Sequence, residues 1–387
     1  MSKGKAKEAL GHILDGFQRR EDPGDLWVEG STGIPVDRDE IPVPGIVLLL
    51  LTEVMGMVNH GIHEKTAWYV PVGFHGHRVT IALEKFGMRI YVVPAKDSDE
   101  RPEEIGREVI WRLQKAARII ERNVLSEYAD SQIEEGRLTI GNQAGRLRAM
   151  YDHFCEATET AFEAASKPPE IGEQGDGVSG LFAGIGERIH QEQVGAWNAI
   201  AAVNAYFSLL EHELVLLTAF TDFDPTNGAL ETFIGDRWSD KFKQLFDLQD
   251  SDNKRIYDRL HDIAETYRNP YSHGGFDKQR AALWFHVEGI GAVPARLSDI
   301  RTSPHFEIFP VRPEGFAEIQ TTLTEIREWL RDGEYWAAFE WIDAGLDVAY
   351  DPEMRDDYRK LMADEKFRRE FIERSSHEWE RRANMDW

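Results

Sequence analysis

The amino-acid sequence predicts a mainly α-helical protein, with a smaller mixed α/β part at the N-terminus and a helical bundle at the centre. Three observations support this fold class. Apolar residues recur at helical spacing over most of the chain. Short strand-like runs are concentrated near the N-terminus. The length of 387 residues exceeds the usual size of one domain, so we expect two or three domains, each with its own core.

The N-terminal region is expected to span residues 1–166 and to mix helices with strands. A short helix begins the chain, and apolar residues follow at 46–58. Residues 102–123 and 145–166 have the apolar periodicity of amphipathic helices. Glu84-Lys85-Phe86-Gly87 separates two apolar runs and indicates a hairpin turn. The runs expected to form strands are residues 67–72, 78–83 and 88–93.

A polar stretch rich in proline and glycine, residues 167–186, predicts a linker between domains. Its glycine-rich second half lacks the Lys-Ser/Thr of a phosphate-binding loop, and we interpret it as a flexible lead into the next helix. The helical bundle is expected to follow at residues 187–290. Its predicted helices are residues 187–220, 238–248 and 252–267.

The C-terminal region, residues 291–387, is expected to contain a strand and a long helical tail. The tail is dense in charge and tryptophan, and it is expected to pack on the bundle or to hold a partner chain. Two runs of alternating character, residues 282–287 and 306–311, are expected to be strands.

Composition limits the classes of function. The chain has 69 acidic and 45 basic residues, a net charge of −24 and a pI near 5.0. A molecule of this charge repels polyanions, which argues against sequence-blind coating of nucleic acid. Any contact with RNA must therefore be local.

The single cysteine and the apolar runs predict a cytoplasmic protein without a membrane segment. Cys155 cannot form an internal disulfide or a thiolate zinc cage, which fits a reducing compartment. Residues 1–17 lack the continuous apolar stretch of a signal peptide. The most apolar run, residues 41–58, is interrupted by Pro42, Pro44 and Glu53.

The most informative motif is a short polar bend that contains Arg268, Asn269 and His273. The three variable residues between Asn269 and His273 are Pro270-Tyr271-Ser272. Arginine is a permanent cation that suits phosphate, and histidine is the side chain that exchanges protons near neutral pH. This combination is suited to RNA cleavage without a metal, and we expect neither a metal nor a cofactor.

Pro270 is expected to bring the polar groups of this bend together. On a continuous helix, a spacing of five would place Arg268 and His273 roughly 140° apart. Proline has no N–H group to donate to residue 266, so the helix should end or kink there. We interpret Asn269-Pro270 as the N-cap and first position of a new turn. Gly274-Gly275 would end that turn beside the imidazole.

This pattern resembles the motif of HEPN domains (higher eukaryotes and prokaryotes nucleotide-binding), whose ribonuclease members carry Arg, a polar residue, three variable residues and His. The resemblance covers residues from about 187 to 280. It implies a bundle of four or five helices, often dimeric, with two bends facing each other. It also implies that His273 acts as general base or acid on a ribose 2′-hydroxyl, that Arg268 stabilises the phosphorane charge, and that Asn269 holds the geometry.

The resemblance also implies a biological setting. HEPN domains occur in bacterial toxins and phage-defence proteins, so we expect RNA as substrate and a homodimer formed through the bundle. Some HEPN toxins are silenced at a tyrosine two residues after the histidine. Gly275 occupies that position here, so the resemblance does not extend to this control. A regulatory partner or trigger would then be of another kind.

Two alternatives remain open at the level of sequence. Glu211 and Asn204 lie beside the apolar stripe of the long helix, and either could reach inward to orient Arg268, or both could be polar edge residues. The whole bundle could also be a non-catalytic dimerisation or sensor module. In that case Arg268 would pair with a buried carboxylate and His273 would bind a carbonyl.

Four histidines cluster near the N-terminus: His60, His63, His75 and His77. If the segment His75-Gly76-His77 lay on a strand, both imidazoles would point to the same side. No cysteine or HExxH pattern supplies further metal ligands, so we expect ordinary surface or core histidines.

Overall fold

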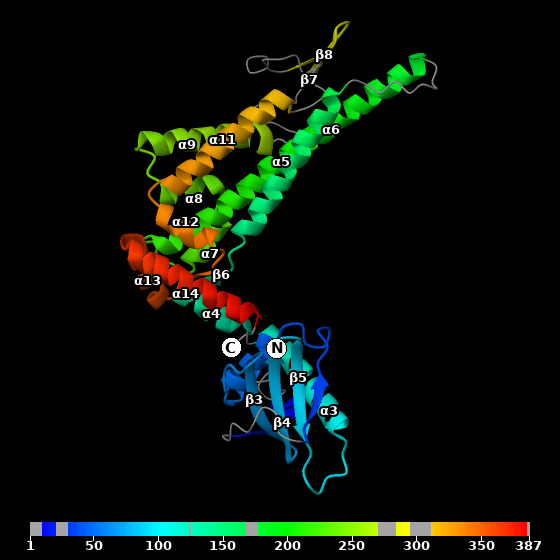
Figure 1. The fold of residues 1–387 in the computed structure, drawn as a ribbon, viewed down its shortest axis with the longest axis vertical. Coiled ribbons are helices and arrows are strands. Elements are labelled where there is room, and N and C mark those ends of the chain that lie inside the picture. The colour runs from blue at the N-terminus through cyan, green and yellow to red at the C-terminus, as the bar shows by residue number, and fades with distance from the viewer. Residues whose placement is uncertain are drawn as a thin grey trace. The chain divides into compact units, whose positions relative to one another are not determined.

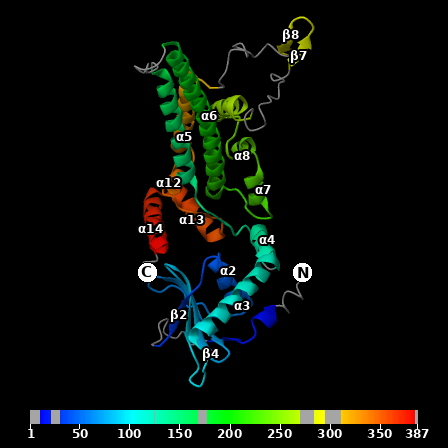
Figure 2. The ribbon, with the colours of Figure 1, turned by 90° about the vertical axis from the view of Figure 1, so that its right-hand side faces the viewer.

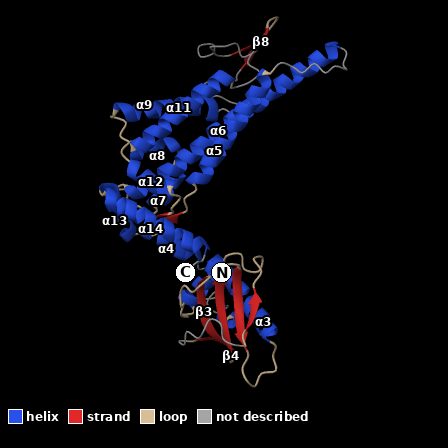
Figure 3. Ribbon diagram, viewed as in Figure 1, coloured by secondary structure: helices blue, strands red, loops and turns tan. Residues whose placement is uncertain are grey.

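A computed structural model describes residues 10–20, 30–123, 125–167, 177–269, 284–294 and 311–384. These residues are mainly helical, with a small antiparallel sheet near the N-terminus, which confirms the predicted fold class (Figure 3). The chain divides into two compact units, one of residues 1–135 with 373–387 and the other of residues 136–372.

The first unit is built on a five-stranded antiparallel sheet with the order β1-β3-β4-β5-β2 (Figure 1). The three strands predicted from alternation are confirmed as β3, β4 and β5, and Lys85 and Phe86 form the turn between β4 and β5. The strands are β1 (Phe17–Arg19), β2 (Thr32–Pro35), β3 (Thr66–Phe74), β4 (His77–Glu84) and β5 (Gly87–Val93).

Helices cover one face of this sheet. The predicted helix at residues 102–123 is confirmed as α3 (Pro102–Asn123), which buries Val109 and Leu113 against Val70 and Ile90 of the sheet. The apolar run around residue 46 forms α2 (Pro44–Leu49) and continues as the π-helix η1 (Leu50–Val54). The helix α4 (Leu125–Glu135) completes this part of the chain.

The segment His75-Gly76-His77 does not lie along one strand. His75 and Gly76 have φ values of 48° and 86°, and they form the turn between β3 and β4. His77 is buried; the Ala95 N–H donates to its Nδ1 (3.1 Å), and its Nε2 lies 2.7 Å from Glu100 Oε2. Its imidazole is thus a hydrogen-bonded core group, as expected for an ordinary histidine.

The second unit is a helical bundle centred on α6 (Gly177–Leu217), which continues as the 3-10 helix η2 (Thr218–Phe220). The helix α5 (Ala144–Ser166) runs antiparallel beside it (Figures 1 and 2). Around the pair lie α7 (Ala229–Gly235), α8 (Trp238–Leu245), α9 (Ser251–Ile263), α11 (Pro313–Asp332), α12 (Trp336–Asp343) and α13 (Pro352–Ala363). The last helix, α14 (Glu365–Asn384), begins in this unit, and its residues from 373 on belong to the first unit. Two short sheets pair β6 (Thr139–Ile140) with β9 (Val348–Ala349), and β7 (Trp284–Val287) with β8 (Gly291–Pro294).

The domain boundary expected at residue 166 is wrong, because α5 belongs to the bundle. A side chain on Gly195 of α6 would lie 2.5 Å from the ring of Phe162 on α5, so glycine permits this close approach. The rings of Tyr151 and Tyr206 also meet, with centroids 5.5 Å apart. The chain passes from one compact unit to the other after residue 135 instead, and again after residue 372. Likewise, residues 177–186 form the first turns of α6 rather than a flexible lead.

The C-terminal helices pack on the bundle, which was one of the two arrangements expected. Leu323 and Ile326 of α11 and Trp341 of α12 share one hydrophobic core with Phe207 and Leu214 of α6. Of the two predicted C-terminal strands, β7 is confirmed at Trp284–Val287, whereas residues 306–310 lie outside the described residues.

Among the described residues, one helix is long and apolar enough to cross a membrane, namely Gly184–Phe220. Two thirds (67%) of its most apolar window is buried inside the protein. Such burial is typical of the central helix of a soluble bundle. The structure therefore has the character of a soluble protein.

Cys155, in the contact between α5 and α6, predicts a loss of stability at alkaline pH. Burial raises the pKa of this thiol from 9.0 to about 11. A folded pKa above the unfolded value favours the folded state below pH 9, and this advantage is lost as the pH rises toward 11. In urea unfolding, the free energy of unfolding of the wild type relative to that of Cys155→Ala should fall by roughly 2 kcal/mol between pH 9 and pH 11. A difference that does not change with pH would contradict the assignment.

Candidate functional site

The Arg268 side chain lies against α6, in the second unit. The predicted helix at residues 252–267 is confirmed as α9, which passes at Ala264 into the π-helix η3 (Ala264–Arg268). Arg268 Nη2 donates to Glu211 Oε1 at 2.9 Å. Its guanidinium carbon lies 5.0 Å from the ring centroid of Phe207. Phe207 and Glu211 are four residues apart on α6 and share one face, so the guanidinium rests on a ring and binds a carboxylate.

Of the two residues proposed to orient Arg268, Glu211 makes the contact. The amide of Asn204 donates to the carbonyl of Ile200 one turn earlier on α6 (2.9 Å). The Arg268 and Glu211 side chains are 25% and 28% exposed, so the ion pair is partly accessible to solvent. A charge-assisted pair at 2.9 Å restricts the rotamers of the guanidinium.

Sequence reasoning missed Lys241 of α8, which is the second cation bound to Glu211. Its ammonium lies 3.6 Å from Glu211 Oε2, and the side chain is only 2% exposed. It also donates to the carbonyl of Ile234 (2.9 Å) and to the carbonyl of Asp236, at the C-terminal end of α7. One glutamate thus bridges two cations.

A sequence signal for Lys241 did exist. Residues Trp238, Lys241, Phe242 and Leu245 follow the i, i+3, i+4, i+7 spacing of a buried helix face. A lysine within such a stripe must find partners inside the protein, because a buried unpaired ammonium is very costly. The stripe could have identified Lys241 as a paired cation, although not its partner.

The interpretation of Asn269 as an N-cap is wrong. An N-cap residue has extended backbone dihedrals, whereas Asn269 is helical, with φ −62° and ψ −44°. Its N–H donates to the carbonyl of Ala264, five residues earlier, and its amide Nδ2 donates to Glu265 Oε1 at 2.8 Å. The helix therefore adapts to Pro270 by widening into a π-helix before the proline, a feature that is frequent at functional sites.

The structure brings together three predicted or newly found groups of the site, namely Glu211, Arg268 and Lys241. Asn269 follows Arg268 directly but binds Glu265. His273 and the residues 270–272 before it lie outside the described residues. Four residues separate Arg268 from His273 in the sequence.

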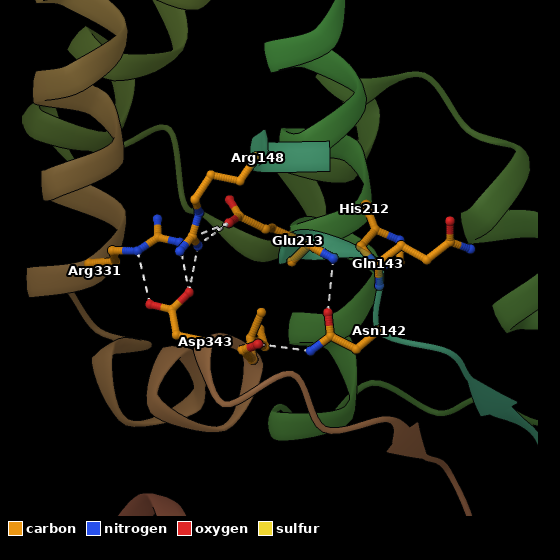
Figure 4. A network of polar contacts seen from close by, with 9 residues as sticks. Asn142, Gln143, Arg148, His212, Glu213, Arg331 and Asp343 are labelled. Atoms are coloured by element: carbon orange, nitrogen blue, oxygen red, sulfur yellow. Dashed lines mark hydrogen bonds and ion pairs between the residues drawn. The ribbon is translucent and has the colours of Figure 1, made fainter. Parts of the chain in front are cut away.

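A second cluster of charges surrounds Glu213 of α6 (Figure 4). Arg331 of α11 donates from Nη2 to Glu213 Oε1 at 2.9 Å and to Asp343 Oδ1 at 3.1 Å. Arg148 of α5 lies 2.5 Å from the same Asp343 oxygen and 3.6 Å from Glu213. Four helices are joined by two arginines and two carboxylates, and we interpret the cluster as structural.

The environment of this cluster determines its protonation states. Burial raises the pKa of Glu213, whose side chain is 3% exposed, while Arg331 and Arg148 oppose that effect. For Asp343 burial acts in the same direction, but hydrogen bonds from Arg331 and Arg148 outweigh it and hold the pKa below its usual range. Burial lowers the pKa of His212, whose Nε2 accepts a hydrogen bond from the Gln143 N–H at 2.9 Å.

In the described part of the chain, no group of three or more His, Cys, Asp or Glu side chains is arranged to hold a metal ion. The corner formed by Phe207, Glu211, Lys241 and Arg268 presents two cations, which are suited to anion recognition. Compared with known proteins, the chain matches no family model, no curated protein and no solved structure.

Proposed function

We propose that this protein is a metal-independent endoribonuclease of the HEPN type. His273 takes the proton of a ribose 2′-hydroxyl, and the resulting oxygen attacks the adjacent phosphorus as the bond from phosphorus to the 5′-oxygen breaks. The protonated imidazole then gives this proton to the leaving 5′-oxygen, which yields a 2′,3′-cyclic phosphate and a 5′-hydroxyl. Arg268 stabilises the charge on the phosphorane oxygens. Glu211 and Asn269 act as positioning residues at the helix end.

One observation carries this proposal: the Glu211 carboxylate holds the guanidinium of Arg268 at a partly exposed helix end, five residues before His273 in the sequence. Arginine has five N–H donors, so the bond to Glu211 leaves others for a phosphate. Lys241 also binds Glu211 and offsets the negative charge of that carboxylate beside Arg268.

The biological part of the proposal rests on the resemblance of the motif. We infer a cytoplasmic toxin or effector of bacterial anti-phage defence that works as a homodimer. The acidic surface of the chain, with net charge −24, would keep the nuclease from binding RNA indiscriminately. A trigger or partner of a kind still to be identified would then control it.

Incubation of the purified full-length protein with total RNA in EDTA tests this function. We expect cleavage that leaves cyclic-phosphate ends and that His273→Ala reduces by at least about 100-fold. His261→Ala is the matched control, because His261 is an exposed histidine of α9 and should leave the rate unchanged. Circular dichroism of each variant checks the fold. RNA that stays intact, with and without lysate from phage-infected cells, contradicts the proposal.

A second candidate function is a non-catalytic dimerisation module, and an exposed apolar row on α6 favours it. Ile185, Ile189 and Trp197 are spaced by multiples of four and are 44%, 42% and 57% exposed. Residues at this spacing lie along one helix face. Intact RNA in all conditions, together with a dimer that Trp197→Glu dissociates in analytical ultracentrifugation, would support this second function.

A further inference from the structure

The outer face of α3, in the first unit, carries a stripe of unpaired cations beside an exposed tryptophan. The stripe consists of Trp111, Lys115, Arg118 and Arg122, whose spacings of four, three and four place them within an arc of about 60°. All four are exposed, Trp111 by 50%. The stripe runs about 16 Å along the helix axis. The opposite face of α3 is buried against the sheet.

The charges of this α3 stripe are not neutralised in the way that other cations of the helix are. Arg107 pairs with Glu40 at 3.3 Å, and Arg112 pairs with Glu108 at 2.7 Å. Lys115, Arg118 and Arg122 form no ion pair with any residue that the structure describes. Lys115 instead places its ammonium 3.7 Å from the ring centroid of Trp111.

Within the stretch of α3 from Trp111 to Arg122, the cations of the stripe outnumber the acidic residues. Glu121 is the one carboxylate of α3 between Trp111 and Arg122, against three unpaired cations. In a chain with net charge −24, three adjacent unpaired cations create a local positive potential on an otherwise repulsive surface. A surface pocket that adjoins the stripe is lined by Pro42, Val43 and Arg118, and also by the carboxylates of Asp39, Glu40 and Glu121, of which Glu40 is paired with Arg107.

We infer that the α3 stripe binds single-stranded RNA, with phosphates on the three cations and a base stacked on Trp111. Cations that follow the backbone and an aromatic ring that stacks a base are the two parts of a single-strand binding surface. The choice of RNA rests on the proposed nuclease function. A lipid surface fits less well, because Trp111 is the one large apolar side chain of the stripe and the apolar face of α3 is inside the core.

Fluorescence anisotropy with labelled oligouridine tests the inference, using the full chain with His273→Ala to prevent cleavage. The triple variant Lys115→Gln, Arg118→Gln, Arg122→Gln should bind at least about tenfold more weakly at low salt. The slope of log affinity against log salt should fall by about 2, since each phosphate contact contributes about 0.7 for single strands. Trp111→Ala should weaken binding about fivefold or more.

The matched control is the triple variant Arg359→Gln, Lys360→Gln, Lys366→Gln, which changes the net charge equally. These cations are exposed on α13 and α14, and each pairs with a carboxylate of its own helix. We expect this control to bind RNA as the parent does. Equal weakening by both triples, or no effect of Trp111→Ala, overturns the inference, because it would show a bulk charge effect or no stacking.

Two further arms separate this inference from the nuclease proposal. Binding to phosphatidylserine vesicles without binding to oligouridine would overturn the RNA surface in favour of a lipid surface. If the chain binds oligouridine through the stripe but leaves total RNA intact, the RNA-binding inference for α3 stands and the nuclease proposal is refuted. If the chain binds and cleaves RNA equally well with and without the stripe cations, only the RNA-binding inference for α3 is refuted.

Discussion

Replacement of Arg268 by methionine should lower the rate of RNA cleavage by roughly 100- to 1,000-fold, because a preorganised cation that faces the developing phosphorane charge contributes on this scale. Methionine keeps the apolar contact with Phe207 and removes only the charge and the donors. The rate is measured in single-turnover cleavage of a labelled RNA, with thermal unfolding of the same preparation as a check of the fold.

Replacements of Arg268 and of its partner Glu211 should lower the cleavage rate by graded amounts. Arg268→Lys keeps a charge but cannot provide planar, forked recognition, so its rate should fall between those of the wild type and the methionine variant. Glu211→Gln should lower the cleavage rate about tenfold, because this replacement frees the guanidinium of Arg268 from its carboxylate partner without removing the guanidinium itself. If Glu211 acts only through Arg268, the effects of Glu211→Gln and Arg268→Met should not add in the double variant.

Arg259→Met provides the matched control for this series. Arg259 is also partly exposed on the same helical segment, and it pairs with Glu325 at 2.6 Å rather than with a site residue. We expect its cleavage rate to equal that of the wild type. A chain that cleaves RNA equally well with and without the Arg268 guanidinium would remove this residue from the mechanism.

The sequence predicted the pair Glu211–Arg268 only as one of several possibilities, and the reason is geometric. Glu211 and Arg268 are 57 residues apart, and periodicity tells which helix face a residue occupies, not which helix it faces. Lys241 was missed because a lysine on an apolar face is ordinarily assumed to be exposed. Its ammonium is held by carbonyls at the end of α7 and by the carboxylate of Glu211. These partners lie outside α8, so the sequence pattern of that helix does not predict them.

Local structure was more predictable than the grouping of elements. The bounds of α3 and the hairpin of β4 and β5 follow from alternation, helical spacing and turn residues near one another in sequence. The boundary at residue 166 was wrong because prolines and glycines mark an interruption of helix without telling whether the flanking helices share a core. The pairing of α5 with α6 depends on Gly195 and Phe162, a contact that composition does not reveal.

Glu213→Leu should reduce the free energy of unfolding by roughly 3 kcal/mol, the largest effect on stability that we expect from a single replacement of a polar residue. The leucine fits an apolar bundle, but it leaves Arg331 and Arg148 with Asp343 as their one remaining carboxylate among the described residues. Both arginines already have a buried nitrogen without a partner, Arg331 Nη1 and Arg148 Nε. The removal of a carboxylate therefore leaves guanidinium groups in a poorly solvated place with one acceptor fewer.

The comparison of Glu213→Leu with Glu325→Leu separates burial from charge pairing. Glu325 also binds an arginine, at 2.6 Å, but its side chain is 53% exposed against 3% for Glu213. Its removal should cost less than about 1 kcal/mol, because water replaces the lost partner of Arg259. Urea unfolding at neutral pH measures both variants. If the two losses were equal, the cluster on α6 would be no more than a surface ion pair, and its place at the junction of four helices would not contribute to holding the bundle together.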